Sequence, residues 1–383
     1  MKIVIIANGY PDKKEPQWGC FERDQALALS EQGHQVSVLY VDKRFRTYWR
    51  RIGFSHLKEK EVDAYGIFIM PTRWIRRLLG SRIHYWVSTR LLEQVYRRYV
   101  REHGCPDIIY AHYLYNIAYA VFLKKKYSVP IVGIEHWSVL NQKTLSPNQM
   151  SLGRIGYNHA DKLLAVSESL KTQIKSHFAI DSTVVYDMLG PEFISPSVKQ
   201  KTIDKGFKFI AVGSLIKRKG YDVLISAFAK SNLAQRRCQV VIVGDGEEKS
   251  NLANQIHELG LTESVLLAGR KSKIGIINLM SECHAFVLSS RAETFGVVCI
   301  EAMSQGLPTI ATICGGPEEL ISEKNGILIP TDDIDAMAEA LCQMYENYGK
   351  YDNVMIANDC ISRFSPKVIA NQLTLIFNNI VKK

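Results

Sequence analysis

Two glutamates, Glu293 and Glu301, have a spacing that points to chemistry rather than to packing. In the segment 289–308 an apolar run ends in small polar residues, a helix is expected to begin near Phe295–Gly296, and Gly306-Leu307-Pro308 ends it. The carboxylates then differ in height by several ångströms, at ~1.5 Å per residue. They could bind the hydroxyls of two different sugars, while the helix amides between them hold phosphates.

Two other interpretations of this pair are weaker. A retaining glycoside hydrolase also uses paired carboxylates, but these must converge on one bond at about 5 to 5.5 Å, which a pair divided between loop and helix is not expected to do. Solvation of a helix surface would explain a lone glutamate. However, Glu301 lies between Ile300 and Ala302 on a largely apolar helix, where an unpaired carboxylate is costly.

Basic residues and glycines follow another expected strand, at Lys208–Val212. Gly213-Ser214 ends this strand, and Lys217-Arg218-Lys219-Gly220 leads into a helix. A diphosphate needs cations and free backbone amides, and a basic loop that opens a helix supplies both. Surface charge explains any single lysine equally well, but Lys219, directly before Gly220, is the strongest candidate.

Two further glycine turns are candidates for close approach of the backbone to a ligand or to a neighbouring helix. Gly244 and Gly246 lack the third glycine of a dinucleotide fingerprint and the Gly-Lys pair of a P-loop. Gly315-Gly316 precedes a proline at an expected helix start and is a candidate anion site.

The elements that must position these residues belong to two parallel sheets covered by helices, because short apolar runs alternate with amphipathic segments throughout. Strands are expected at 3–7, 36–41, 67–70, 108–111, 131–134 and 162–166, then at 208–212, 239–243, 265–268, 285–288 and 309–311. We place the boundary near residue 200, which gives domains 1–200 and 201–364. A final helix, 365–383, opens at Ser365-Pro366 and is expected to pack toward the first domain.

These motifs together resemble the retaining nucleotide-sugar glycosyltransferases of family 4, nearly end to end. That family has the GT-B fold, an α/β architecture of two Rossmann-like domains that face each other across a cleft. The resemblance rests on the Lys219-Gly220 turn, the Gly244 turn, the Glu293 to Glu301 segment, Gly306-Leu307-Pro308, Gly315-Gly316 and Asn325-Gly326. Each motif is weak alone, and the set is specific.

The resemblance implies roles for individual residues. It gives catalytic roles to His112, Lys219 and Glu293. It assigns donor binding to Gly19, Gly213, Ser214, Arg218, Lys219, Gly244, Glu293, Thr294, Phe295, Gly296, Val297 and Glu301. Acceptor-side candidates are Glu135, His136 and Trp137. Without the resemblance, a buried structural role is the default for His112.

Two positions depart from the family pattern. Ser214 stands where an arginine commonly meets the donor diphosphate, so Lys219, with Arg218 or Lys217, must carry more of that charge. Cys20 stands where the glycine loop of the first domain usually has a second glycine.

A metal ion is not expected to be required, and no other cofactor is implied. Asp333-Ile334-Asp335 matches the Asp-x-Asp string of metal-dependent transferases, but acidic residues at a helix N-terminus explain it better. The eight cysteines are scattered without Cys-x-x-Cys pairs, which fits a reducing, cytoplasmic compartment.

The net charge of +10 lies in the first half, where residues 1–200 hold 28 Lys and Arg against 18 Asp and Glu. Within it, residues 43–101, here called the basic aromatic region, interleave arginines with Trp49, Trp74 and Trp86. Such a surface suits the anionic headgroups on the inner face of a membrane. A solvated basic face is as good an explanation, and nucleic acid is not expected because no nucleic-acid module is present.

We therefore expect transfer of a hexose-type sugar from a nucleoside diphosphate sugar to a lipid-linked or polysaccharide acceptor, with retention implied by the resemblance. Two alternatives share the sequence features. A nucleotide-sugar 2-epimerase would release nucleotide and sugar without an acceptor. A non-catalytic sugar-nucleotide-binding protein that docks on membranes would bind the donor and never turn over.

Overall fold

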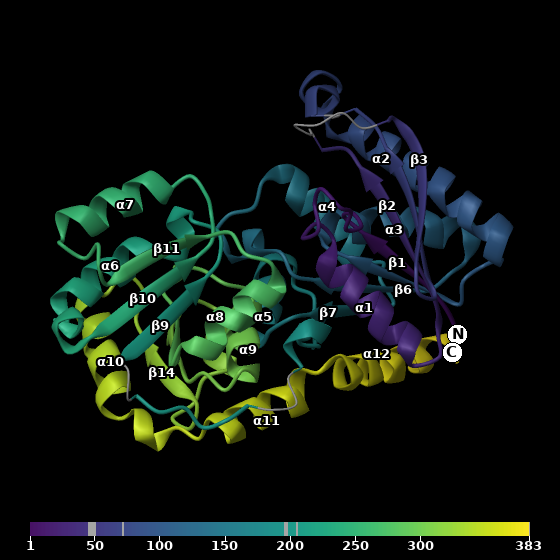
Figure 1. Ribbon diagram of the computed structural model, residues 1–383. Helices are drawn as coiled ribbons and strands as arrows, with labels where there is room; N and C mark the ends of the chain where they lie inside the picture. Colours follow the sequence, from purple (N-terminus) through teal and green to yellow (C-terminus); the bar gives the residue numbers. More distant parts are fainter. Residues whose placement is uncertain (45–50, 71–72, 195–197, 204–205, 383) are drawn as a thin grey trace. The chain divides into compact units, whose positions relative to one another are not determined.

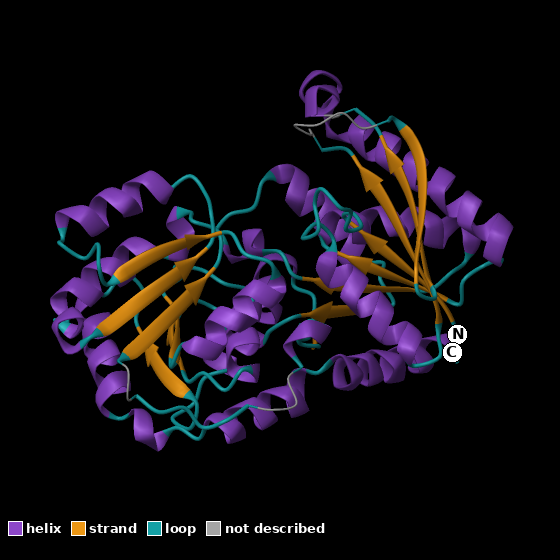
Figure 2. Cartoon of the chain, viewed as in Figure 1, coloured by secondary structure: helices purple, strands orange, loops and turns teal. Residues whose placement is uncertain are grey.

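The computed structural model describes residues 1–44, 51–70, 73–194, 198–203 and 206–382, with the backbone alone for 73–81. It divides into two units, Met1–Tyr186 with Pro366–Lys383, and Asp187–Ser365. Figure 1 traces the chain through both, and Figure 2 shows that each is a sheet covered by helices. Each unit is considered separately below.

In the described part of the first unit, the strands form one sheet in the order β3-β4-β2-β1-β5-β6-β7-β8. All neighbouring strands pair in parallel except β3 with β4. The strands are β1 (Lys2–Ala7), β2 (Gln35–Asp42), β3 (Gly53–Glu59), β4 (Val62–Phe68), β5 (Ile108–His112), β6 (Ile131–Glu135), β7 (Lys162–Ala165) and β8 (Thr183–Val184). Ile3, Val4 and Ile5 are inaccessible to solvent, as expected for a central strand covered on both faces.

The helices of the first unit cover both faces of this sheet. They are α1 (Cys20–Glu31), α2 (Arg73–His103), α3 (Leu114–Tyr127), α4 (Pro147–Tyr157), α5 (Glu168–Phe178) and α12 (Pro366–Val381). The crossovers β1-α1-β2 and β5-α3-β6 run in opposite directions along the sheet. Because parallel crossovers are right-handed, α1 and α3 lie on opposite faces. Helix α12 lies beside α1 (Figure 1).

The second unit repeats this plan with the strand order β11-β10-β9-β12-β13-β14, all parallel. Its strands are β9 (Phe207–Val212), β10 (Cys238–Val243), β11 (Val265–Gly269), β12 (Ala285–Leu288), β13 (Thr309–Thr312) and β14 (Gly326–Ile329). Its helices are α6 (Tyr221–Lys230), α7 (Lys249–Glu258), α8 (Lys273–Glu282), α9 (Val297–Ser304), α10 (Ile334–Glu346) and α11 (Asn353–Phe364). The predicted α/β class with two parallel sheets is confirmed.

The hairpin β3-β4 differs from expectation. A strand was predicted at 67–70, but β4 ends at Phe68 and pairs antiparallel with β3 through a turn at Lys60, whose φ is 51°. Strand β3 is at the edge of the sheet and exposes Phe54 and Leu57. It therefore lacks the continuous apolar run that marks the buried strands. Strand β14, also at an edge, was likewise missed.

The division between the units falls earlier than residue 200. The amide of Leu189 donates to the carbonyl of Phe364 at 2.9 Å, and Gln305 Nε2 donates to the carbonyl of Phe193 at 2.9 Å. The side chain of Phe193 is fully buried. The stretch from Asp187 onward therefore belongs to the second unit.

Within the described residues, no helix is both long enough and apolar enough to span a bilayer.

Helix α12 is anchored to the first unit by an apolar face that includes Phe377, which is fully buried and meets the ring of Tyr110 at 5.2 Å between centroids. We predict that Phe377→Ala destabilises the first unit by about 3–5 kcal/mol, since a large buried ring is replaced by a cavity. Leu375→Ala, on the same helix at 66% exposure, should change the stability little. Calorimetry and amide hydrogen exchange of α12 would measure both, and equal effects would contradict the assignment.

Candidate active site

The loops that could do chemistry follow the strands where the strand order reverses. In the second unit this point lies between β9 and β12, which are neighbours in the sheet while the chain leaves them in opposite directions. Ligands of open parallel sheets bind at such points, beyond the carboxyl ends of the strands. The loop after β9 contains Lys219, and the loop after β12 contains Glu293.

An ion pair joins these two loops. Lys219 Nζ lies 2.5 Å from Glu293 Oε1, and the side chains are 14% and 10% exposed. Ser290 Oγ donates to the same carboxylate oxygen at 2.7 Å. The structure thus brings together two predicted catalytic residues from segments that are far apart in sequence, in a largely desolvated position.

Hydrogen bonds to backbone carbonyls hold the two loops together. Arg218 Nη1 donates to the carbonyl of Ala292 at 3.0 Å, and the amide of Arg291 donates to the carbonyl of Arg218 at 2.8 Å. Ser289 Oγ donates to the carbonyl of Lys219 at 2.9 Å. Arg218, predicted as a donor ligand, therefore braces the Glu293 loop in this structure.

Two glycine positions permit this close approach. Gly220 has φ 63°, and a Cβ atom there would lie 2.0 Å from the carbonyl oxygen of Ser289. A Cβ atom on Gly244 would lie 1.8 Å from the carbonyl oxygen of Gly213. No larger residue fits either position without displacing the neighbouring backbone, which explains the glycines at 220 and 244.

Helix α9 begins four residues after Glu293, at Val297. Thr294 and Phe295 lead to Gly296, which precedes the helix without a side-chain cap, and Val297 is the first helical residue. The first amides of a helix have no acceptor within it, so this end suits an anion. Phe295 is fully buried against Phe364, at 5.7 Å between ring centroids, which fixes the start of the helix.

Two other predicted residues of this unit are at least partly exposed to solvent. Ser214 is exposed at the end of β9, and Glu301 is partly exposed in the second turn of α9. The amide of Gly315 is already bound to the carboxylate of Glu318, at 2.8 and 3.1 Å. The Gly315-Gly316 turn is therefore occupied by its own chain.

The first unit has an equivalent reversal between β1 and β5. After β1 the chain folds back so that a Cβ atom on Gly19, with φ 78°, would lie 2.3 Å from the carbonyl oxygen of Gly9. The guanidinium of Arg44 stacks 3.4 Å from the ring of Trp18 and pairs with Glu15 at 2.9 Å. Cys20, which stands where the family's glycine loop usually has a second glycine, is the buried first residue of α1.

His112 ends β5 and is fully buried. Its Nδ1 lies 3.2 Å from His136 Nε2, and the two rings stack at an interplanar angle of 7°. Its Nε2 has no hydrogen-bond partner in the described structure. Burial, with His136 alongside, holds the pKa of the His112 imidazole well below its usual value, so the ring is neutral at physiological pH.

Glu135 is also fully buried, and its carboxylate is bound by its own chain. Oε1 accepts the amides of His136 and Trp137, both at 2.9 Å, and Oε2 accepts the hydroxyl of Tyr157 at 2.6 Å. Burial nevertheless raises the pKa of this carboxyl above its usual value. Glu135 therefore shapes the loop that presents His136 and Trp137, and Trp137 packs on Tyr115 at 5.3 Å between centroids.

Several residues that support the loops of the two units were not predicted from the sequence. Ser290 and Arg291 lie inside the predicted segment without a signal of their own, whereas Arg44 lies in the basic aromatic region and looked like surface charge. Arg291 binds Asp222 and Asp332, at 2.8 and 2.6 Å, and so stiffens the Glu293 loop.

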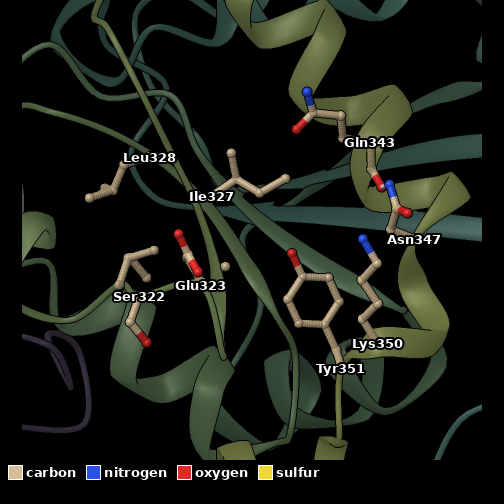
Figure 3. Close-up of a pocket in the computed structure, with 10 residues that line it drawn as sticks. Ser322, Glu323, Ile327, Leu328, Gln343, Asn347, Lys350 and Tyr351 are labelled. Carbon is tan, nitrogen blue, oxygen red and sulfur yellow. Dashed lines mark hydrogen bonds between the residues drawn. The ribbon is translucent and has the colours of Figure 1, made fainter.

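A separate hollow of about 590 Å³ lies at the amino end of β14 (Figure 3). Gln343, Asn347 and Lys350 line one wall, and Ser322, Glu323 and Leu328 line the other. None of the predicted site residues borders it, and the chemistry-bearing loops follow the opposite, carboxyl ends of the strands.

Asp333 caps helix α10. Its carboxylate accepts the amide of Ala336 at 2.9 Å, and Asp335 pairs with Lys230. The interpretation of the Asp-x-Asp string as a helix start is confirmed.

Comparison with known proteins bears directly on this arrangement. Residues 23–188 match the model described as Glycosyltransferase Family 4, and residues 195–359 match that described as Glycosyl transferases group 1. An uncharacterized glycosyltransferase of Methanocaldococcus jannaschii is 28% identical over 63% of this chain and 66% of its own length. N-acetyl-alpha-D-glucosaminyl L-malate synthase of Bacillus anthracis is 23% identical over 100% and 98%, and a putative teichuronic acid biosynthesis glycosyltransferase of Bacillus subtilis is 24% identical over 91% and 90%.

Solved structures share the fold over nearly the whole chain. Sucrose-phosphate synthase from Thermosynechococcus elongatus has a TM-score of 0.79 at 17% identity and covers 99% of this chain and 98% of its own. The HepE protein of Anabaena, solved with UDP-glucose, has a TM-score of 0.70 at 21% identity and covers 99% and 100%.

Because the two family models together extend over both units and the fold is shared almost end to end, this chain belongs to the family 4 glycosyltransferases, transferases with the GT-B fold.

Proposed function

We propose that this transferase moves a hexose-type sugar from a nucleoside diphosphate sugar to a glycan or lipid-linked acceptor, with retention at the anomeric carbon. The observation that carries the proposal is the Lys219–Glu293 ion pair at the strand-order reversal, next to the uncapped start of α9. A cation, a carboxylate and free helix amides are the groups that a sugar joined to a diphosphate requires.

In this proposal the donor diphosphate draws Lys219 away from Glu293. Negative charge develops on the departing diphosphate, and Lys219 with the first amides of α9 stabilises it. Glu293, released from part of its pairing, accepts hydroxyls of the transferred sugar, and Glu301 binds the ribose. The neutral ring of His112 orients the acceptor or sugar without adding positive charge, and the leaving phosphate takes the acceptor proton.

Named proteins of similar sequence or fold support the substrate classes. HepE of Anabaena was solved with UDP and glucose as well as with UDP-glucose, which favours a nucleotide-sugar donor here. The putative teichuronic acid transferase favours an acceptor in surface polysaccharide assembly. We infer a setting at the cytoplasmic face of the membrane.

The donor site can be tested with Lys219→Met. We expect UDP-glucose, UDP-galactose, UDP-N-acetylglucosamine or GDP-mannose to raise the melting temperature of the wild type. The variant, and Glu301→Ala, should lose that shift because the diphosphate or the ribose loses its partner. Turnover of the donor by Lys219→Met should fall about 10²–10³-fold.

The matched control is Lys230→Met, a surface lysine of the same unit paired with Asp335. It should keep both the shift and the activity. If Lys219→Met is as active as this control, or if no nucleotide sugar shifts the wild type, the proposed donor site is wrong. Release of free sugar in the absence of any acceptor would instead indicate an epimerase-like reaction.

We further propose that transfer needs no divalent metal, since Lys219 and helix amides supply the positive charge that a metal would otherwise give the diphosphate. We predict that activity after extensive dialysis against EDTA stays within twofold of the untreated enzyme. A loss of activity that added Mg²⁺ or Mn²⁺ restores would contradict the proposal.

Part of the basic aromatic region is proposed to rest on an anionic membrane surface. Part of its positive charge is paired within the region, since Arg90 and Arg97 both pair with Glu93. Arg82 and Arg101 are exposed on α2, as is Trp86 at 58%. Residues 45–50 and the side chains of 73–81, which include other members of the region, lie outside the described structure.

We predict co-sedimentation with phosphatidylglycerol vesicles at low salt, and not with phosphatidylcholine vesicles. Arg82→Gln should lower the partition coefficient about fivefold, because each cation near the surface contributes about 1 kcal/mol. Lys350→Gln, an exposed lysine of the second unit, serves as the control. Equal binding to both vesicle types would show that the basic face is only solvated.

A further inference from the structure

A cavity of about 230 Å³ lies within the first unit, at the carboxyl ends of β1 and β2 and against α2 and α3. Its polar lining includes Asn8, Lys43, His84, Tyr115, Asn116 and Asn148. Neither the proposed donor site nor the acceptor-side candidates Glu135, His136 and Trp137 include these residues. The volume is below the range of a complete ligand pocket, so the cavity would hold one group of a larger molecule.

Lys43, the residue after β2, contributes a cation to this cavity. Its Nζ donates to Ser88 Oγ at 2.7 Å and lies 5.0 Å from the ring centroid of Tyr119. A hydroxyl and an aromatic face satisfy part of an ammonium group but do not neutralise it. Burial lowers the pKa of Lys43 to about 8, which indicates a poorly solvated amine.

The nearby carboxylates are bound elsewhere. Asp42 pairs with Arg44 at 3.2 Å, and Arg44 also pairs with Glu15. Glu93, on the same helix as His84, binds Arg90, Arg97 and Lys126. In the described residues no carboxylate is within ion-pair distance of Lys43. Lys43 is therefore a partly buried cation that has no carboxylate counter-ion among the residues that the structure describes.

Neutral polar groups complete the lining. Asn116 Nδ2 donates to Asn8 Oδ1 at 3.1 Å across the reversal between β1 and β5, and Tyr115 and Asn148 border the same space. Amide and phenol groups are suited to the hydroxyls that surround an anionic group on a sugar or polyol.

We propose that this cavity binds an anionic oxygen group, phosphoryl or carboxyl, of the acceptor, with Lys43 as its counter-ion. The acceptor class is therefore an anionic one, such as a sugar phosphate or an acidic polyol, rather than a neutral glycoside. The identification of this ligand as the acceptor rests on the proposed function. Anion binding by Lys43 is a property of the first unit and needs neither donor nor turnover.

The test is a calorimetric titration of the full chain, without nucleotide sugar, with three probes. Glucose 1-phosphate carries a phosphoryl group, succinate carries carboxyl groups, and methyl glucoside is neutral. We expect at least one anionic probe to bind at least tenfold more tightly than methyl glucoside, and the stronger anion identifies the group. Equal or absent binding of all three probes would overturn the proposal.

Lys43→Met should reduce the binding of the preferred anion at least tenfold, whereas Lys58→Met, an exposed lysine on β3, should not change it. Retained binding in Lys43→Met would show that the anion lies elsewhere. The melting temperature of each variant and its shift with UDP-glucose monitor the fold and the donor site. A lost anion site with an intact donor shift separates this inference from the proposed function.

A pH series on the wild type is a second test. Because the pKa of Lys43 is about 8, the amine is charged below that pH and neutral above it. Affinity should therefore fall between pH 7.5 and 9.5, and binding at pH 8.5 should take up protons. His84 is another titratable side chain in the lining, so a His84→Asn variant in the same pH series should keep the dependence assigned to Lys43. An affinity that is constant across the series would contradict the role of Lys43.

Discussion

The ion pair between Lys219 and Glu293 is the interaction on which the proposed chemistry of the second unit depends. It joins a loop after β9 to a loop after β12, and a network of backbone bonds from Arg218, Ser289 and Arg291 holds these loops at that separation. A buried cation and carboxylate stabilise each other only while both are present. In the proposed function, a bound diphosphate would take the place of Glu293 as the partner of Lys219.

Both units place their polar residues by the same topological device. In each sheet the chain reverses direction beside its first strand, and the loops diverge there without a helix between them. In the second unit the divergence holds Lys219 and Glu293, while in the first it holds the Asn8–Asn116 contact and, close by in sequence, His112. Glycines at positions such as 19, 220 and 244 let the backbones approach at these points, where any side chain would collide with a carbonyl oxygen.

The sequence predicted the sheets well because buried parallel strands are continuous apolar runs. It singled out Lys219 and Glu293 because their loops carry glycines and charges together, and the structure brings these two side chains into contact. The sequence missed β3 because an exposed edge strand has no continuous apolar run. It could not show that Glu135 accepts the hydroxyl of Tyr157, or that Lys43 meets Ser88 and no carboxylate among the described residues, since both depend on neighbours distant in the chain. Asp333 was assigned correctly because capping is local.

The return of α12 to the first unit has a consequence for how the protein is made. Residues 1–186 leave the ribosome before the second unit, but the helix that covers α1 and buries Phe377 against Tyr110 is synthesised only after the second unit. The second unit is continuous in sequence and can complete its fold during translation. The first must wait with an apolar face uncovered, so newly made chains should depend on chaperones until the final helix emerges, and premature termination anywhere in the second unit would leave the first unfinished.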